Sequence, residues 1–170
     1  RSHSERLQRS EHLGRKLSEL LELIARSGAL EPVLRKLMVL IKRHCGRDAA
    51  ILLKTNGRLE LIAASGNIRA GMCSELSDLV SSNIGFACGG NIEFPKDIPV
   101  QGCAAIVAIH EGGGKLLGCV LLLGASAAIP SEWELLRRAA RVASIAVQHR
   151  QIEDQIMFDA QHDPATELPN

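Results

Sequence analysis

Hydrophobic residues recur along this chain with two different periods, and each period predicts its own kind of element. From about Ser4 to Arg26 they return every three or four positions, with charged residues between them, which predicts an amphipathic helix. A second helix is predicted from Glu31-Pro32 through Cys45, because proline suits the first turn of a helix. The apolar stripes of the two helices comprise Leu13, Leu17, Leu20, Leu21 and Ile24, and then Val33, Leu37, Leu40 and Ile41.

Two pairs of apolar runs predict two β-hairpins. Residues 49–65 form the first pair, joined by Asn56-Gly57, a dipeptide in which both residues tolerate the positive φ of a tight hairpin turn. Residues 102–125 form the second pair, joined by the glycines at 112–114. The strands of this second hairpin are nearly all apolar, as expected for central strands that are covered on both faces.

Between the hairpins the pattern is less regular. Residues 71–83 predict a short helix, and a Gly-rich stretch from 84 to 99 follows, with one short strand at Asn91–Phe94. The whole order predicts an α+β fold, in which helices pack on one face of an antiparallel sheet and a long helix ends the chain. Irregular segments would then cover the other face, where a ligand pocket can form.

The last helix is the longest element that the sequence predicts. Pro130 precedes Ser131 and Glu134, which fit a capping box, and helix-forming residues then continue to about Gln161. Apolar residues in its second half step by three and four, which is typical of a coiled-coil seam. Because no sheet remains for this part of the helix, we expect a homodimer through the N- and C-terminal helices. The predicted seam comprises Val142, Ile145, His149, Ile152 and Ile156.

Composition excludes several classes of protein. The chain has 170 residues, 46% of them hydrophobic, which suffices for the core of one domain. Its net charge of +1 gives no electrostatic basis for binding nucleic acid or an anionic membrane. No apolar run approaches the ~20 residues that span a bilayer, so we expect a cytoplasmic fragment. A membrane anchor before Arg1 in the full-length parent protein is left open.

The five cysteines predict buried structural thiols in a reducing compartment. Their number is odd and no pair has C-x-x-C spacing. A zinc site would need tighter clusters with histidines nearby, and His44-Cys45 is the single adjacent pair, so no metal site is predicted. The cysteines are Cys45, Cys73, Cys88, Cys103 and Cys119.

From about Leu17 to Gln148 the chain resembles a GAF domain. "CAAIVAIHEGGGKLLGCVLLL" is similar to the late hairpin of that family, with a polar turn and then a glycine, here Gly118, inside the next strand. "IPSEWELLRRAARVASIAVQHR" is similar to its final helix. The resemblance implies a sensory or dimerisation domain whose antiparallel sheet carries helices.

The last residues, "DAQHDPATELPN", resemble the start of a GGDEF domain, the output domain of diguanylate cyclases. Ala165 and Glu167 depart from the family pattern, and the signature loop is not within the sequence, so no enzyme activity is expected of these residues themselves. By resemblance Asn170 corresponds to an asparagine that contacts the guanine base. The matching residues are Ala160, His162, Asp163, Pro164, Thr166, Leu168, Pro169 and Asn170.

These resemblances divide the chain into four parts. Residues 1–16 are an N-terminal helix or linker, 17–148 the GAF domain, 149–161 a helical linker, and 162–170 the truncated start of the GGDEF domain.

The Gly-rich stretch is the candidate pocket wall. "GFACGG" lacks the Lys-Ser/Thr of a phosphate-binding loop, but its Cys88-Gly89 matches a related group of GAF domains. The chain has no Tyr and few aromatic residues, so neither haem nor bilin is expected, and a small-molecule ligand stays unidentified. His110, beside the glycine turn, reads as a solvated turn residue. The candidate wall residues are Phe86, Cys88, Asn91 and Phe94.

Three functions remain open at this stage. The first is a sensor that controls a GGDEF output domain through a dimeric helical linker. The second is a dimerisation spacer with a filled core and no ligand. The third is a thiol-dependent enzyme, because methionine sulfoxide reduction is known on GAF folds.

Overall fold

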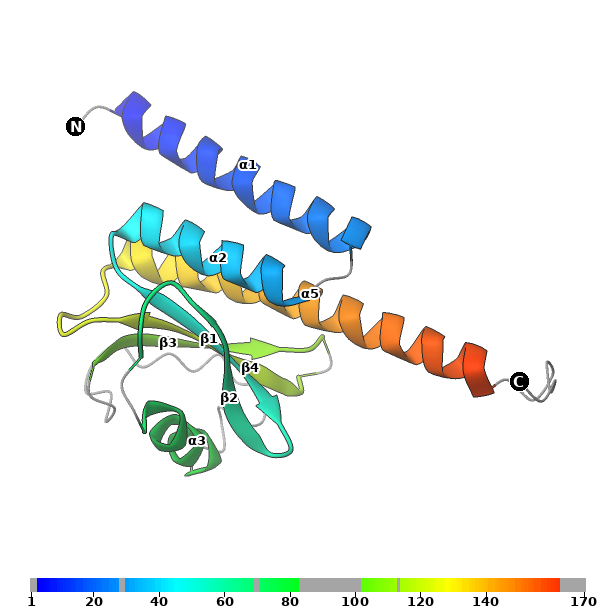
Figure 1. The fold of residues 1–170 in the computed structure, drawn as a ribbon. Helices are drawn as coiled ribbons and strands as arrows, with labels where there is room; N and C mark the ends of the chain where they lie inside the picture. The colour runs from blue at the N-terminus through cyan, green and yellow to red at the C-terminus, as the bar shows by residue number, and fades with distance from the viewer. Residues whose placement is uncertain (1–2, 28–29, 69–70, 83–101, 113, 163–170) are drawn as a thin grey trace.

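The computed structural model describes residues 3–27, 30–68, 71–82, 102–112 and 114–162. Five helices and strands occupy the first half: α1 (His3–Ser27), α2 (Leu30–Cys45), β1 (Ala49–Thr55), β2 (Arg58–Ala64) and α3 (Met72–Ser82). β3 (Cys103–His110), β4 (Leu116–Leu123) and α5 (Pro130–His162) follow (Figure 1).

The four strands form one antiparallel sheet in the order β2-β1-β4-β3. Both predicted hairpins are present, and β1 and β4 join them at the centre. In the first hairpin Asn56 and Gly57 have φ of 52° and 82°, the left-handed values that a tight two-residue turn requires. The sequence pattern therefore identified both the turn and its mechanism.

A large apolar core lies between the sheet and the helices α2 and α5, which cover one face, and α1 packs on the outside of these two helices (Figure 1). Its fully buried side chains come from the periodic positions of α2 and from alternate strand positions. This confirms the predicted α+β fold, with helices on one face and a long C-terminal helix. The largest contributors are Leu34, Leu37, Met38, Ile41, Ile51, Ile109 and Leu122.

The helix α3 lies on the opposite face of the sheet, which adds a feature to the predicted arrangement (Figure 1). Met72 and Leu76 of α3 are buried against Leu52 and Ile106 of the strands, within a second apolar cluster. Ser77 ties α3 to β2, because its hydroxyl accepts a hydrogen bond from the backbone N–H of Leu59 at 3.0 Å. The second face is thus covered in part by a helix, where irregular segments were expected.

The start of α5 differs from the predicted capping box by two residues. The helix begins at Pro130, so Glu132 is its third residue, and its Oε1 accepts a hydrogen bond from the backbone N–H of Ile129 at 2.9 Å. This is the carboxylate half of a capping box. Glu134 lies further along and instead forms exposed ion pairs with Arg137 and Arg138.

Some predictions fall outside the described residues. The Gly-rich stretch from 84 to 99, with its short strand at Asn91–Phe94, lies there, as does the GGDEF-like segment from residue 163 onward. The boundaries at 16/17 and 148/149 fall inside α1 and α5, which run through them as continuous helices, so the division into four parts stays a prediction. Within the described ranges, none of the helices is both long and apolar enough to cross a bilayer.

Candidate functional site

The second half of α5 extends beyond the sheet and exposes a row of large apolar side chains (Figure 1). Of the predicted seam, Val142 is buried in the core at 5% exposure, whereas Ile145, Ile152 and Ile156 are 48%, 60% and 62% exposed. The structure therefore assigns the first seam residue to the domain's own core and leaves the later ones uncovered within this chain. Met157 and Phe158 are also 63% and 55% exposed, but at about 100° per residue they lie on other faces of the helix. We call the surface formed by Ile145, Ile152 and Ile156 the linker surface.

His149 lies between Ile145 and Ile152 along the helix and is half-buried. Its Nδ1 atom is buried and has no hydrogen-bond partner, and the nearest acidic oxygen, Oε1 of Glu153, is 3.7 Å away. Because this nitrogen is already inaccessible within the single chain, it gives no evidence for or against a partner. Both interpretations of His149, a packed interface residue and a pH-sensitive one, remain predictions.

The middle of α5 is fixed to the end of β3 by a short polar chain. Ser144, 8% exposed, donates a hydrogen bond from Oγ to the carbonyl of His110 at 2.6 Å and accepts one from Gln148 at 2.8 Å. His110, the last residue of β3, is half-buried, and its interpretation as a solvated turn residue stays a prediction. A cavity of about 450 Å³ opens beside this chain, lined among others by Arg137 and Arg141.

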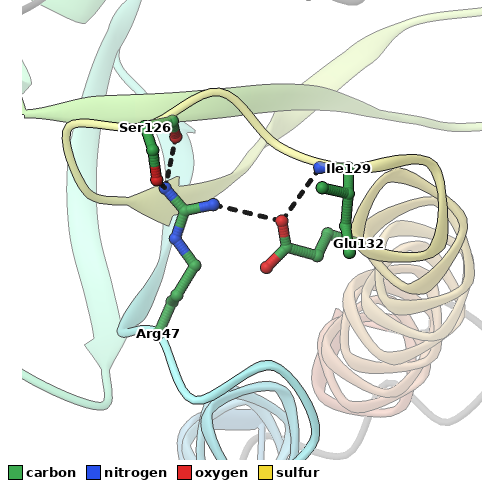
Figure 2. Close-up of polar contacts among 4 residues, drawn as sticks. All are labelled: Arg47, Ser126, Ile129 and Glu132. Carbon is green, nitrogen blue, oxygen red and sulfur yellow. Dashed lines mark hydrogen bonds and ion pairs between the residues drawn. The ribbon is translucent and has the colours of Figure 1, made fainter.

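The start of α5 is held by Arg47, which follows α2. Figure 2 shows its guanidinium between Ser126 and Glu132. Nη1 donates to Oε1 of Glu132 at 3.1 Å, and Nη2 donates to the carbonyl oxygen of Ser126 and to its Oγ. The same carboxylate oxygen also accepts the N–H of Ile129, so one residue caps α5 and binds the cation. This cluster was missed because its members are far apart in the sequence.

A groove of about 1330 Å³ lies between α1 and α2. Basic side chains from both helices line it, including Arg9, His12 and Lys16 of α1 and Arg43 and His44 of α2. Sequence analysis did not identify this groove. The available signal was the spacing of Arg9, His12 and Lys16, which places three basic residues on one helical face.

The predicted pocket wall, Phe86, Cys88, Asn91 and Phe94, lies outside the described residues, and so does Asn170. On the face of the sheet that carries α3, the described residues form the second apolar cluster. There the sheet is filled by aliphatic side chains such as Leu52, Leu76 and Leu121, each with 0% exposure.

Three of the four described thiols are shielded from reaction. Burial is the main cause that raises the pKa of Cys45 to about 11 and that of Cys103 to about 12, and burial also raises the pKa of Cys119. The thiolate is the nucleophilic form, so these three side chains are poor nucleophiles at neutral pH. In the described part of the chain, no group of three or more His, Cys, Asp or Glu side chains is placed to hold a metal ion.

No family model and no curated protein matches the sequence. Among solved structures, the chain is similar to the GAF domain of a protein assigned as a sensor histidine kinase from Pseudomonas syringae pv. tomato, with 16% identity, a TM-score of 0.62 and coverage of 91% of this chain and 95% of that one. The chain has the GAF fold.

Two further structures show how different the proteins with this GAF fold are. One is the GAF domain from a phosphoenolpyruvate-protein phosphotransferase of Coxiella burnetii, with 14% identity, a TM-score of 0.56 and coverage of 84% of this chain and 96% of that one. The other is free methionine-R-sulfoxide reductase from Neisseria meningitidis in complex with its substrate, with 15% identity, a TM-score of 0.56 and coverage of 85% and 91%. Because a fold hosts several functions, the site residues must decide between them.

Proposed function

We propose that this chain is the GAF regulatory domain of a cytoplasmic GGDEF-family signalling protein, together with the helical linker that leads to its output domain. The similarity to GAF domains of proteins named as a sensor kinase and a phosphotransferase supports a regulatory role. The GGDEF-like residues from His162 to Asn170 support the nature of the output domain, with Asn170 as its guanine contact. The chain itself acts without catalysis in this proposal.

The observation that carries the proposal is the linker surface of α5. Ile152 and Ile156 are more than half exposed on a continuous helix that has left the sheet, at the a/d spacing of a coiled coil. Exposed apolar side chains in such a row favour burial against a partner. A second copy of the same helix supplies a matching surface by symmetry, so the chain forms a homodimer, with the N-terminal helix α1 beside the paired linkers.

The proposed mechanism is transmission through α5. The first half of the helix is part of the domain core, where Leu136, Ala139 and Ala143 are fully buried. A small molecule that binds the GAF domain biases one of two arrangements of the paired helices, and residues 149–161 carry this bias to the output domains. The proposed ligand wall is Phe86, Cys88, Asn91 and Phe94; neither nucleic acid nor membrane takes part.

The test is the phase of the linker in the full-length parent. One residue inserted between Gln151 and Ile152 rotates everything downstream by about 100°, and seven residues approximately restore the phase of a heptad seam. We expect the single insertion to change cyclic di-GMP output strongly and the seven-residue insertion to leave it near normal. Equal output from the two insertions would show that the helix is a tether and would reject the transmission mechanism.

A second candidate function is a dimerisation spacer that binds no ligand. The filled apolar cluster beneath α3 favours it, since Leu52, Leu76 and Leu121 occupy the described part of that face. Native mass spectrometry separates the two candidates, because a small molecule retained by the purified parent supports the sensor. If the purified parent retains no small molecule and both insertions give equal cyclic di-GMP output, the result supports the spacer.

A further inference from the structure

The groove between α1 and α2 is strongly basic on a chain whose net charge is only +1. Two carboxylates, those of Glu5 and Glu19, are among its lining residues. The basic lining residues are Arg9, His12, Lys16, Arg35, Lys36, Arg43 and His44. The groove therefore concentrates positive charge on one side of the domain.

Only part of this charge is balanced within the chain. Lys16 pairs with Glu19 at 3.4 Å and Arg35 with Glu31 at 2.6 Å, each within one helix. Among the described residues, no carboxylate lies within ion-pair distance of Arg9, Lys36 or Arg43. Unbalanced cations that line a concave surface raise the local concentration of anions.

The charges converge at the end of the groove where α1 begins and α2 ends. Partial burial lowers the pKa of His44, and the positive charges of Arg9 and Arg138 and the nearby His12 lower it further. Arg138 belongs to α5 and is paired with Glu134 at 3.5 Å. Basic groups from two other helices thus act on one imidazole, and a bound anion would relieve their mutual repulsion.

The groove changes in chemistry along its length, from the charged Arg9–His44 end to an apolar middle. Because α1 and α2 are consecutive and antiparallel (Figure 1), Arg9 and His12 lie toward the end of α2, opposite Arg43 and His44. Further along, the lining includes Leu20, Leu23, Val39 and Leu40, with Val39 39% exposed, and Lys36 and Arg35 line the groove beyond Val39. The groove is therefore suited to a ligand with an anionic head and an apolar body.

We propose that the α1–α2 groove binds a phosphorylated small molecule, with its phosphate at the Arg9–His44 end and its body against Val39 and Leu40. A phosphate dianion presents three acceptor oxygens and fits donors that approach from separate elements. This site is distinct from the Gly-rich segment proposed above and does not depend on the output domain. A ligand here bridges α1 and α2.

Linkage gives the proposal a spectroscopic signature. An anion near His44 favours the protonated imidazole, so binding raises the pKa of His44, and by reciprocity the affinity rises as the pH falls through that pKa. Sulfate is the suitable probe for the pH dependence because it remains a dianion throughout. The groups that face His44 are Arg9, His12 and Arg138.

The experiment is an NMR titration of the histidine ring protons of this chain at constant ionic strength. We expect sulfate to raise the pKa of His44 and to leave the chemical shifts of the ring protons of His149, which lines neither the groove nor the cavity beside Ser144, unchanged. Inorganic phosphate and phenyl phosphate should shift the His44 signal with a Kd at or below about 1 mM, and phenyl phosphate should bind several-fold more tightly. Arg9→Gln should weaken both by about tenfold.

Arg15→Gln is the matched control, because Arg15 lies on the same helix and is exposed but does not line the groove. Equal losses in the two variants, or no shift of His44 at about 10 mM of either phosphate, would overturn the site. If inorganic phosphate and phenyl phosphate bind with equal affinity, the proposal that the ligand's apolar body lies against Val39 and Leu40 is wrong. Light scattering on the same samples reports the oligomeric state separately, so failure of the proposed dimer is not confused with failure of this site.

Discussion

Arg47 and Glu132 lie 85 positions apart in the sequence, yet Nη1 of Arg47 is 3.1 Å from Oε1 of Glu132 in a largely buried contact. Their side chains are 17% and 10% exposed. Arg47 follows the end of α2, and Glu132 belongs to the first turn of α5. The pair therefore fixes the start of the helix that we propose as the transmission element to the domain core.

Replacing Glu132 should destabilise the domain far more than replacing Glu134. Glu132→Ala leaves the buried guanidinium of Arg47 without its carboxylate and the N–H of Ile129 without its acceptor, which should lower the free energy of unfolding by about 2–3 kcal/mol. Glu134→Ala removes exposed pairs and should cost less than about 1 kcal/mol. Urea denaturation of the two variants measures the difference, and similar midpoints would contradict the role given to Glu132.

A methyl group at Gly118 should be poorly tolerated. In β4 a Cβ at this position would clash with the carbonyl oxygen of Leu52 and lie 2.9 Å from Cα of Leu53, both on the neighbouring strand β1. We expect Gly118→Ala to lower the free energy of unfolding by about 1–3 kcal/mol, because backbone is the obstacle. Gly112→Ala is the control, since a Cβ there meets nothing within 4 Å. An unaltered melting temperature for Gly118→Ala would be inconsistent with this packing.

The hairpin turn makes a separate stability prediction. Gly57 has a φ of 82°, which a β-branched residue adopts only with strain. Gly57→Val should cost roughly 1 kcal/mol or more, measured by thermal denaturation. Thr55→Val, at a strand position beside the turn, should change the stability much less. If both variants have the melting temperature of the unsubstituted chain, the turn is not the one described.

The linker surface predicts a dimer in solution. Ile152→Glu combined with Ile156→Glu should give a monomer with the circular dichroism and melting behaviour of a folded GAF core, because both side chains lie outside that core. Gln151→Glu with Gln155→Glu adds the same charge away from the predicted seam and should leave the dimer intact. Light scattering measures the oligomeric state. If the unsubstituted chain is monomeric at high concentration, the basis for the proposed interface is removed.

The thiols of Cys45 and Cys103 should react slowly while the chain is folded. The raised pKa of Cys45, about 11 against an ordinary 9.0, lowers its thiolate fraction at neutral pH by about 100-fold. Alkylation by iodoacetamide, followed by peptide mass spectrometry, should show this suppression relative to guanidinium-unfolded chain. Rapid modification of Cys45 or Cys103 in the folded chain would restore the thiol-enzyme alternative.

The same shift has a consequence for stability at high pH. The folded chain holds the thiol proton more tightly than the unfolded chain, so the contribution of Cys45 to stability is complete below pH 9.0 and is lost as the pH rises toward about 11. We therefore expect the free energy of unfolding to fall over this range. Cys45→Ser should reduce that slope.

The sequence by itself determined the elements whose causes are local. The periods of α1 and α2 and the turn at Asn56-Gly57 depend on residues within a few positions of one another, so they could be predicted. The α+β arrangement followed from the order of these elements, and its resemblance to a GAF domain agrees with the observed fold.

Only the tertiary structure decided which surfaces are covered. Val142 and Ile145 share one predicted seam, but the domain core buries the first and leaves the second exposed. Glu132, and not Glu134, caps α5. The same carboxylate binds Arg47, which lies 85 positions earlier in the sequence, so periodicity alone could not reveal this contact. The basic groove likewise depends on α1 packing against α2 and on Arg138 of α5 approaching His44. The burial of a side chain and the electrostatic potential around it both depend on elements that are distant in the sequence. The hydrophobic periodicity of a single element therefore cannot predict them.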